Sequence, residues 1–123
     1  MGVIEEFRRE RRELRLAFFY DAKRVVEEAF AINEGDLLKP SKRPIRMDAK
    51  KTLFFLCYMN NMPIKYIKEL LDNEGYHPKR ETITEGISSI EHKMATENYY
   101  HELIYDLYSK CASLESGKKL AEH

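Results

Sequence analysis

The chain has 123 residues, of which 43% are hydrophobic, and its 21 Lys and Arg residues balance 21 Asp and Glu residues. This length suits one compact domain, residues 1–123, and excludes two independent domains, while scarce Gly and Pro favour an all-α fold. No apolar stretch approaches the ~20 residues that span a bilayer, and the charged N-terminus does not resemble a signal peptide. We therefore expect no membrane association and a cytoplasmic location.

The first predicted helix covers residues 3–31, and residues 1–21 form its N-terminal part. A break near Tyr20 stays open, and Gly35 stands just beyond the predicted end, where glycine often caps a helix. The opening turns, EEFRRERREL, favour a solvated, self-paired surface, with a second DNA-contacting stripe as the alternative. Apolar residues recur along the helix at helical spacing: Phe7, Leu14, Phe18, Val25 and Ala29.

A basic segment follows at residues 36–51, DLLKPSKRPIRMDAKK. Two prolines and a serine interrupt it, so some of its charges must project from an irregular connector that leads into the next helix. Such a connector is suited to binding the phosphate backbone of a nucleic acid, because Asp48 is the one acidic residue of this segment after Asp36. The cations are Lys39, Lys42, Arg43, Arg46, Lys50 and Lys51.

The second predicted helix starts near Met47 or Asp48, where Asp can cap the backbone N–H groups, and ends at about Asn60. A third helix begins at Pro63, because proline loses no hydrogen bond at a first helical position. Its apolar face consists of Ile64, Ile67, Leu70 and Leu71.

Residues 72–76 are predicted to form a turn, and Pro78 reopens a fourth helix. This helix carries Ile83, Ile87 and Ile90 on one face. Gly86 lies between them and lowers helix propensity by about 1 kcal/mol relative to Ala. We therefore expect a close contact there with the preceding helix.

The last predicted helix covers residues 95–114, starting at about Thr96, and residues 115–123 are predicted to be a frayed tail. Its broad apolar face favours packing over the first helix within the monomer. A homodimer or protein-partner surface is the alternative. That surface would comprise Tyr100, Leu103, Leu107 and Tyr108, next to Ile104 and Cys111.

The sequence contains no pattern typical of an enzyme or a metal site. Cys57 and Cys111 lie in apolar helical patterns and are expected to be buried, reduced thiols. The four His residues form no zinc-binding spacing, and no paired carboxylates mark a catalytic cleft. We expect no catalytic residue, no metal and no cofactor.

Two short helices joined by a turn, with a supporting helix and a basic loop before them, are typical of a helix-turn-helix DNA-binding protein. Lys65, on the third helix, is a candidate for a backbone contact. The start of the fourth helix would enter the major groove, where Arg and Lys donate to guanine or phosphate and Thr contacts phosphate or a thymine methyl. The candidate residues there are Lys79, Arg80, Thr82 and Thr84.

Residues 22–94 resemble the C-terminal DNA-binding domain of DnaA, the bacterial chromosomal replication initiator. VVEEAFAINEGDLLKPSKRP is similar to that family's leading helix, its D-L-L pattern and its basic loop, and MDAKKTLFFLCYM to its A-R-x-x-A-M-Y-L helix. MPIKYIKELL is similar to the supporting helix, and TITEGISSIE to the recognition helix T-V-L-H-A-I-R-K-I-E. The resemblance implies a cluster of about five to six helices that docks on duplex DNA.

The chain differs from that family at the residues with which the family recognises DNA bases. GYHPKRET replaces G-G-R-D-H-T-T, so that Lys79, Arg80 and Glu81 stand where the family has Asp-His-Thr. No G-x-x-x-x-G-K-[ST] loop of an ATPase occurs. We expect a small stand-alone, bacterial DNA-binding protein, related to replication or transcription, with a different target sequence. The alternative is a protein-interaction module on the same scaffold.

Overall fold

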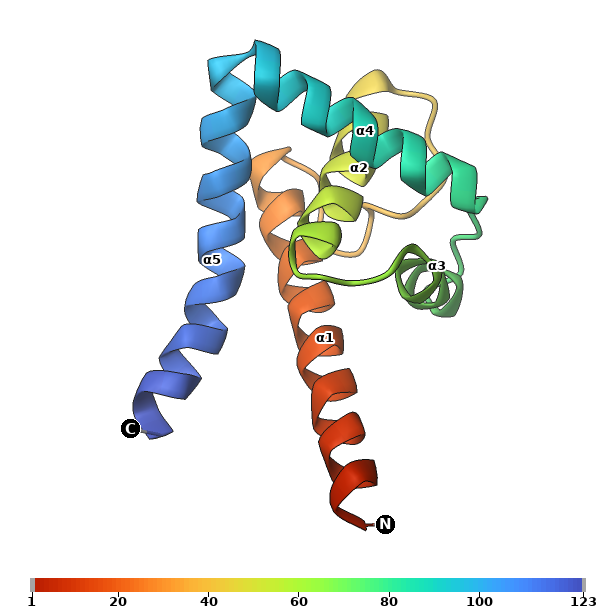
Figure 1. Cartoon of the computed structure of the whole chain (residues 1–123). Coiled ribbons are helices and arrows are strands. Elements are labelled where there is room, and N and C mark those ends of the chain that lie inside the picture. The colour runs from red at the N-terminus through yellow and green to blue at the C-terminus, as the bar shows by residue number, and fades with distance from the viewer. Residues whose placement is uncertain (1, 123) are drawn as a thin grey trace.

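The computed structural model describes the backbone of residues 2–122 and the side chains of residues 2–111. This part of the chain forms five helices and no strand, which confirms the predicted all-α class (Figure 1). Within it no helix is long and apolar enough to cross a membrane. The helices are α1 (Gly2–Ala29), α2 (Pro44–Met59), α3 (Ile64–Asn73), α4 (Arg80–Thr96) and α5 (Asn98–Glu122).

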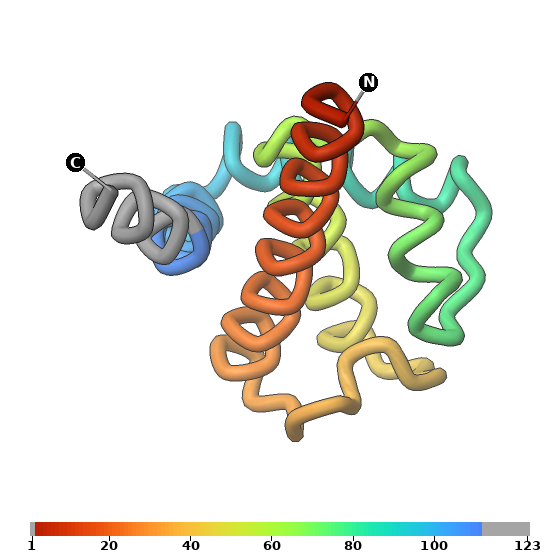
Figure 2. Tube along the Cα trace, turned by 90° about the horizontal axis from the view of Figure 1, so that it is seen from below, coloured from red at the N-terminus to blue at the C-terminus, as the bar shows by residue number. Residues whose placement is uncertain are grey.

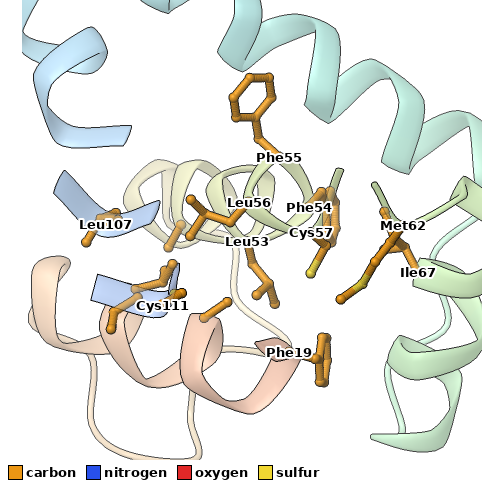
Figure 3. Close-up of a cluster of buried hydrophobic side chains, with 14 of the residues drawn as sticks. Phe19, Leu53, Phe54, Phe55, Leu56, Cys57, Met62, Ile67, Leu107 and Cys111 are labelled. Carbon is orange, nitrogen blue, oxygen red and sulfur yellow. The ribbon is translucent and has the colours of Figure 1, made fainter. Parts of the chain in front are cut away.

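Helix α2 is the centre of the fold. Its sequence is apolar around most of its circumference, so it is stable only when other helices surround it. It packs against α1, α3, α4 and α5. Figure 3 shows Leu53 on the side of α2 that faces Phe19 of α1, and Phe55 on the opposite side. Leu53 and Phe54 are almost completely buried, at 0% and 1% exposed.

Helices α1 and α5 lie side by side and run in opposite directions (Figures 1 and 2). The ring centroids of Phe18 in α1 and Tyr108 in α5 are 5.9 Å apart. Ile104 and Leu107 are buried in the core. The prediction that the last helix covers the first within the monomer is therefore confirmed.

The first half of α1 departs from the predicted apolar face. Phe7 is 59% and Leu14 is 45% exposed, and buried side chains of α1 begin only at Phe18. Helix α1 is continuous through Tyr20, so the break left open there does not occur. The periodicity of the sequence is the same along the whole helix, but the neighbouring helices bury only its second half.

The end of α1 also differs from the prediction. The helix stops at Ala29, and Ala31, not Gly35, takes the left-handed conformation of a helix C-terminus, with φ 54°. The backbone N–H of Ile32 donates to the carbonyl of Glu27 at 2.8 Å, which closes the terminal turn. Gly35 has φ 85° as well, but it lies further along the following loop.

Two further boundaries differ. Helix α2 begins at Pro44 with Arg43 before it, and no side chain caps it, so Asp48 is not its cap. Pro44 suits this position because a first helical residue needs no N–H partner. Helix α5 continues to Glu122, past the predicted end at residue 114. Gly75, with φ 84°, ends α3 in the predicted turn.

Candidate nucleic-acid interface

A buried carboxylate shapes the connector between α1 and α2 (residues 30–43). The Glu27 side chain accepts hydrogen bonds from the backbone N–H groups of Gly35 at 3.0 Å and Leu37 at 3.1 Å. Leu37 is fully buried and Glu27 is 5% exposed. The first half of the connector is therefore held against α1, while Lys42 and Arg43 in its second half are exposed.

Two of the acids near the connector, Asp36 and Asp48, are paired with cations, whereas Glu34 in the first half of the connector is exposed and forms no ion pair among the described residues. Asp36 forms an ion pair with Lys39 at 2.7 Å, and that contact lowers the pKa of the Asp36 carboxyl. Asp48 forms an ion pair with Lys93 of α4 at 3.2 Å. Neither carboxylate forms an ion pair with Lys42, Arg43 or Lys51, although the charge of Arg46 also contributes to the lowered pKa of Asp36.

The remaining cations of the basic segment have no ion-pair partner among the described side chains. Lys42 and Arg43 are exposed, and Lys51 is half-buried beside α4. The Arg46 guanidinium donates to the backbone carbonyl of Asp36 at 2.8 Å, which orients it without neutralising its charge. The connector and the start of α2 thus carry a concentrated positive charge.

Lys50 does not lie on the exposed surface that the sequence predicted. It is 4% exposed, because α2 is buried around most of its circumference. Its ammonium lies 4.8 Å from the centroid of the Tyr76 ring. Burial, and secondarily the positive charge of Arg46, lower the pKa of Lys50.

Helix α3 and the turn after it carry both free and paired cations. Lys65 is exposed, as predicted for a backbone contact. Lys68 instead pairs with Asp72 at 3.1 Å, and the Nδ1 atom of His77 lies 2.9 Å from the same carboxylate. The contacts with His77 and Lys68 lower the pKa of Asp72.

The start of α4 is accessible but mixed in charge. Lys79 and Arg80 are exposed, whereas Thr82 is half-buried and less available than predicted. The Thr84 hydroxyl donates to the carbonyl of Arg80 at 3.1 Å. A shallow hollow of about 330 Å³ lies here, lined by Arg80, Glu81, Thr84 and Glu85. Glu81 lies in the first turn of α4 and Glu85 one turn further on, so these carboxylates oppose the approach of phosphate at the start of the helix as well as beyond it.

The two predicted groups of DNA-binding residues lie on the same side of the molecule. In Figures 1 and 2 the second half of the connector and the start of α4 both lie away from α5. They are separate positive regions on one side.

The predicted partner surface on α5 is largely used inside the monomer. Leu107 is 1% exposed, and Tyr100, Leu103 and Tyr108 are half-buried against the core. Leu107 lies in the core of the monomer and is not accessible to a partner there, and binding of a partner through this helix stays a prediction. The exposed aromatic side chains of this helix are Tyr99 and Tyr105.

The cysteines and the acids form no further site. Cys57 and Cys111 are both buried free thiols, as predicted, and burial raises the pKa of Cys57. Over residues with described side chains, no group of three or more His, Cys, Asp or Glu is placed to hold a metal ion.

The comparisons with known proteins add no relative. No protein-family model, curated protein or solved structure matches the chain. The resemblance to the DnaA domain therefore stays a prediction from sequence motifs, and the functional argument depends on the geometry described above.

Proposed function

We propose that this chain binds double-stranded DNA through the connector, the start of α2 and the first turn of α4. The observation that carries the proposal is the pairing of Asp36 and Asp48 with Lys39 and Lys93, which leaves Lys42, Arg43 and Lys51 without an ion pair among the described residues. Neutralising phosphates releases counterions and supplies most of the affinity for DNA. A net charge of zero for the whole chain does not oppose this role, because the charge is segregated.

A helix-turn-helix arrangement of α3 and α4 supports docking in the major groove. Figure 1 views α3 end-on while α4 runs across the view, and Figure 2 agrees, so the two helices cross steeply. Lys79 and Arg80 then stand at the exposed N-terminal turn that would face base edges. In this proposal the protein acts on DNA in a bacterial cytoplasm, in replication or transcription, in the manner of a DnaA C-terminal domain.

The first test is the salt dependence of binding to a random-sequence duplex, measured by fluorescence anisotropy. With about six cations on phosphates, log K falls against log salt with a slope of about −5. Replacing Lys42 and Arg43 by Ala lowers the slope magnitude by about 2. Lys110→Ala, at an exposed lysine of α5, is the matched control and leaves the slope unchanged. A flat salt dependence contradicts the proposal.

The second test concerns base recognition by α4. Arg80→Ala loses about 1–3 kcal/mol of discrimination between a selected duplex and a random one if Arg80 contacts a base. Lys42→Ala weakens both duplexes equally, because a phosphate contact carries no sequence information. Equal losses on both duplexes for Arg80→Ala remove the recognition role of α4 but leave backbone binding intact.

One observation favours a protein-interaction module as a second candidate. The exposed side of α4 carries Glu81, Glu85 and Glu91, which would repel phosphate and attract a basic partner. Charge-neutralising variants separate the two candidates. Replacing these acids by Gln strengthens duplex binding if α4 docks on DNA, and has no effect on duplex binding if α4 faces a protein.

A further inference from the structure

The stem of Lys50 is buried, while its ammonium reaches solvent and has no acidic partner among the described residues. Lys50 is 4% exposed, and no ion pair or hydrogen bond of its ammonium occurs among the described residues. Its close neighbours are the Tyr76 ring, at 4.8 Å, and the positive charge of Arg46, which disfavours the protonated ammonium. The contact with the aromatic ring compensates only part of the loss of hydration.

A largely buried charge of this kind destabilises a fold unless an opposite charge meets it. The nearest acid along the chain, Asp48, is engaged with Lys93. Asp36, whose carbonyl holds Arg46, has its carboxylate engaged with Lys39. No acid among the described residues therefore pairs with Lys50, and an anion from outside the chain can reach its ammonium.

Arg46 adds the geometry that an oxyanion requires. It lies one helical turn before Lys50, so the two side chains share one face of α2. One of its Nη atoms donates to the carbonyl of Asp36, which leaves further N–H donors of the guanidinium fork available. The N-terminus of α2 has no side-chain cap, so the positive end of the helix dipole adds to the same charge.

We infer that Arg46 and Lys50 form a seat for a single phosphate group on α2, beside the Tyr76 ring. A planar guanidinium and a compact ammonium together can bind the several oxygens of a phosphate, and a single carboxylate offers fewer oxygens to them. The phosphate belongs to the DNA backbone or to a free phosphate compound. In the first case the inference rests on the proposed DNA binding, whereas in the second it does not.

The experiment compares wild type with Lys50→Met, which keeps an apolar stem of similar length and removes the charge. Thermal unfolding is followed with inorganic phosphate against chloride at constant ionic strength. We expect phosphate to raise the Tm of wild type. In the absence of phosphate, Lys50→Met should have a higher Tm than wild type. Phosphate should raise the Tm of Lys50→Met by less than it raises that of wild type. Arg46→Gln, on the more exposed part of the seat, also loses the phosphate gain and guards against misfolding of the first variant.

A second arm measures anisotropy on a random-sequence duplex. If the seat takes a backbone phosphate, Lys50→Met lowers affinity about tenfold and the salt slope by about one. Lys110→Met is the matched control in both arms. A phosphate gain without duplex binding by wild type supports a free phosphate compound and rejects the proposed function. If wild type binds the duplex, and Lys50→Met has the same affinity and the same rise in Tm with phosphate, the phosphate site at Arg46 and Lys50 is wrong. The proposed DNA binding is then kept.

Discussion

Gly86 of α4 lies directly against the ring of Phe54 of α2. A Cβ atom at position 86 would approach Cδ2 of Phe54 to 3.0 Å and Cγ of Lys51 to 3.1 Å. The close contact that the sequence predicted for Gly86 therefore exists, but with α2 rather than with the preceding helix, α3. Phe54 is 1% exposed and stacks on Tyr76, with centroids 6.4 Å apart, so it has little room to move.

Replacing Gly86 by Ala should destabilise the protein although Ala favours helix. The propensity gain is about 1 kcal/mol, whereas forcing a methyl group into a packed core costs about 1–3 kcal/mol. We expect a net loss of about 1 kcal/mol in the free energy of unfolding, measured by urea denaturation. The loss shrinks in a Phe54→Leu background, which gives the methyl group space. If Gly86→Ala alone raised the free energy of unfolding by about 1 kcal/mol, that result would contradict this packing.

Replacing Ala31 by Gly should stabilise the protein. Ala31 has φ 54°, a left-handed conformation that costs an L-residue about 1–2 kcal/mol and costs glycine little. Its side chain is exposed, so no packing is lost. After the entropy that glycine adds to the unfolded chain, we expect a gain of about 0.5 kcal/mol in urea denaturation. Ala17→Gly, at an exposed position inside α1, is the control and should lower stability by about 1 kcal/mol.

Removing the Glu27 carboxylate should loosen the connector. Glu27→Ala leaves the N–H groups of Gly35 and Leu37 without their acceptor, at a cost of about 2–4 kcal/mol. Hydrogen exchange of these two amides, followed by NMR, should accelerate more than exchange in α4. Glu28→Ala, at an exposed neighbour, is the matched control. Equal protection in both variants would mean that the connector is held by Leu37 alone.

Helical periodicity was sufficient to predict the number and order of the helices, because buried apolar faces repeat along each of them. The helix ends were harder. An alanine in a left-handed cap, as at position 31, has no sequence signal, so the sequence pattern indicates Gly35 as the cap instead. The start of α2 has a usable signal in Pro44, but Asp48, which also suits a cap, forms a partly exposed ion pair with Lys93 of α4 instead.

The candidate site shows the same limit. A run of lysines and arginines suggests solvent exposure, and Lys42 and Arg43 follow that expectation. Lys50 does not, because its burial depends on α3, α4 and the position of Tyr76, which are distant in the sequence. The role of Glu27 was missed for the same reason. Which acids remain available to neutralise the basic segment is decided only by tertiary pairing.

The last prediction asks whether α5 faces the core or a partner. Leu107 is 1% exposed, so Leu107→Ala should cost about 2–5 kcal/mol in the free energy of unfolding. Tyr105, on the exposed side of the same helix, is the matched control, and Tyr105→Ala should change stability by less than about 0.5 kcal/mol. Sedimentation velocity, run with urea denaturation, separates the two possibilities. If Leu107→Ala kept wild-type stability but dissociated a dimer, the apolar face of α5 would be intermolecular, and its packing on α1 within one chain would be wrong.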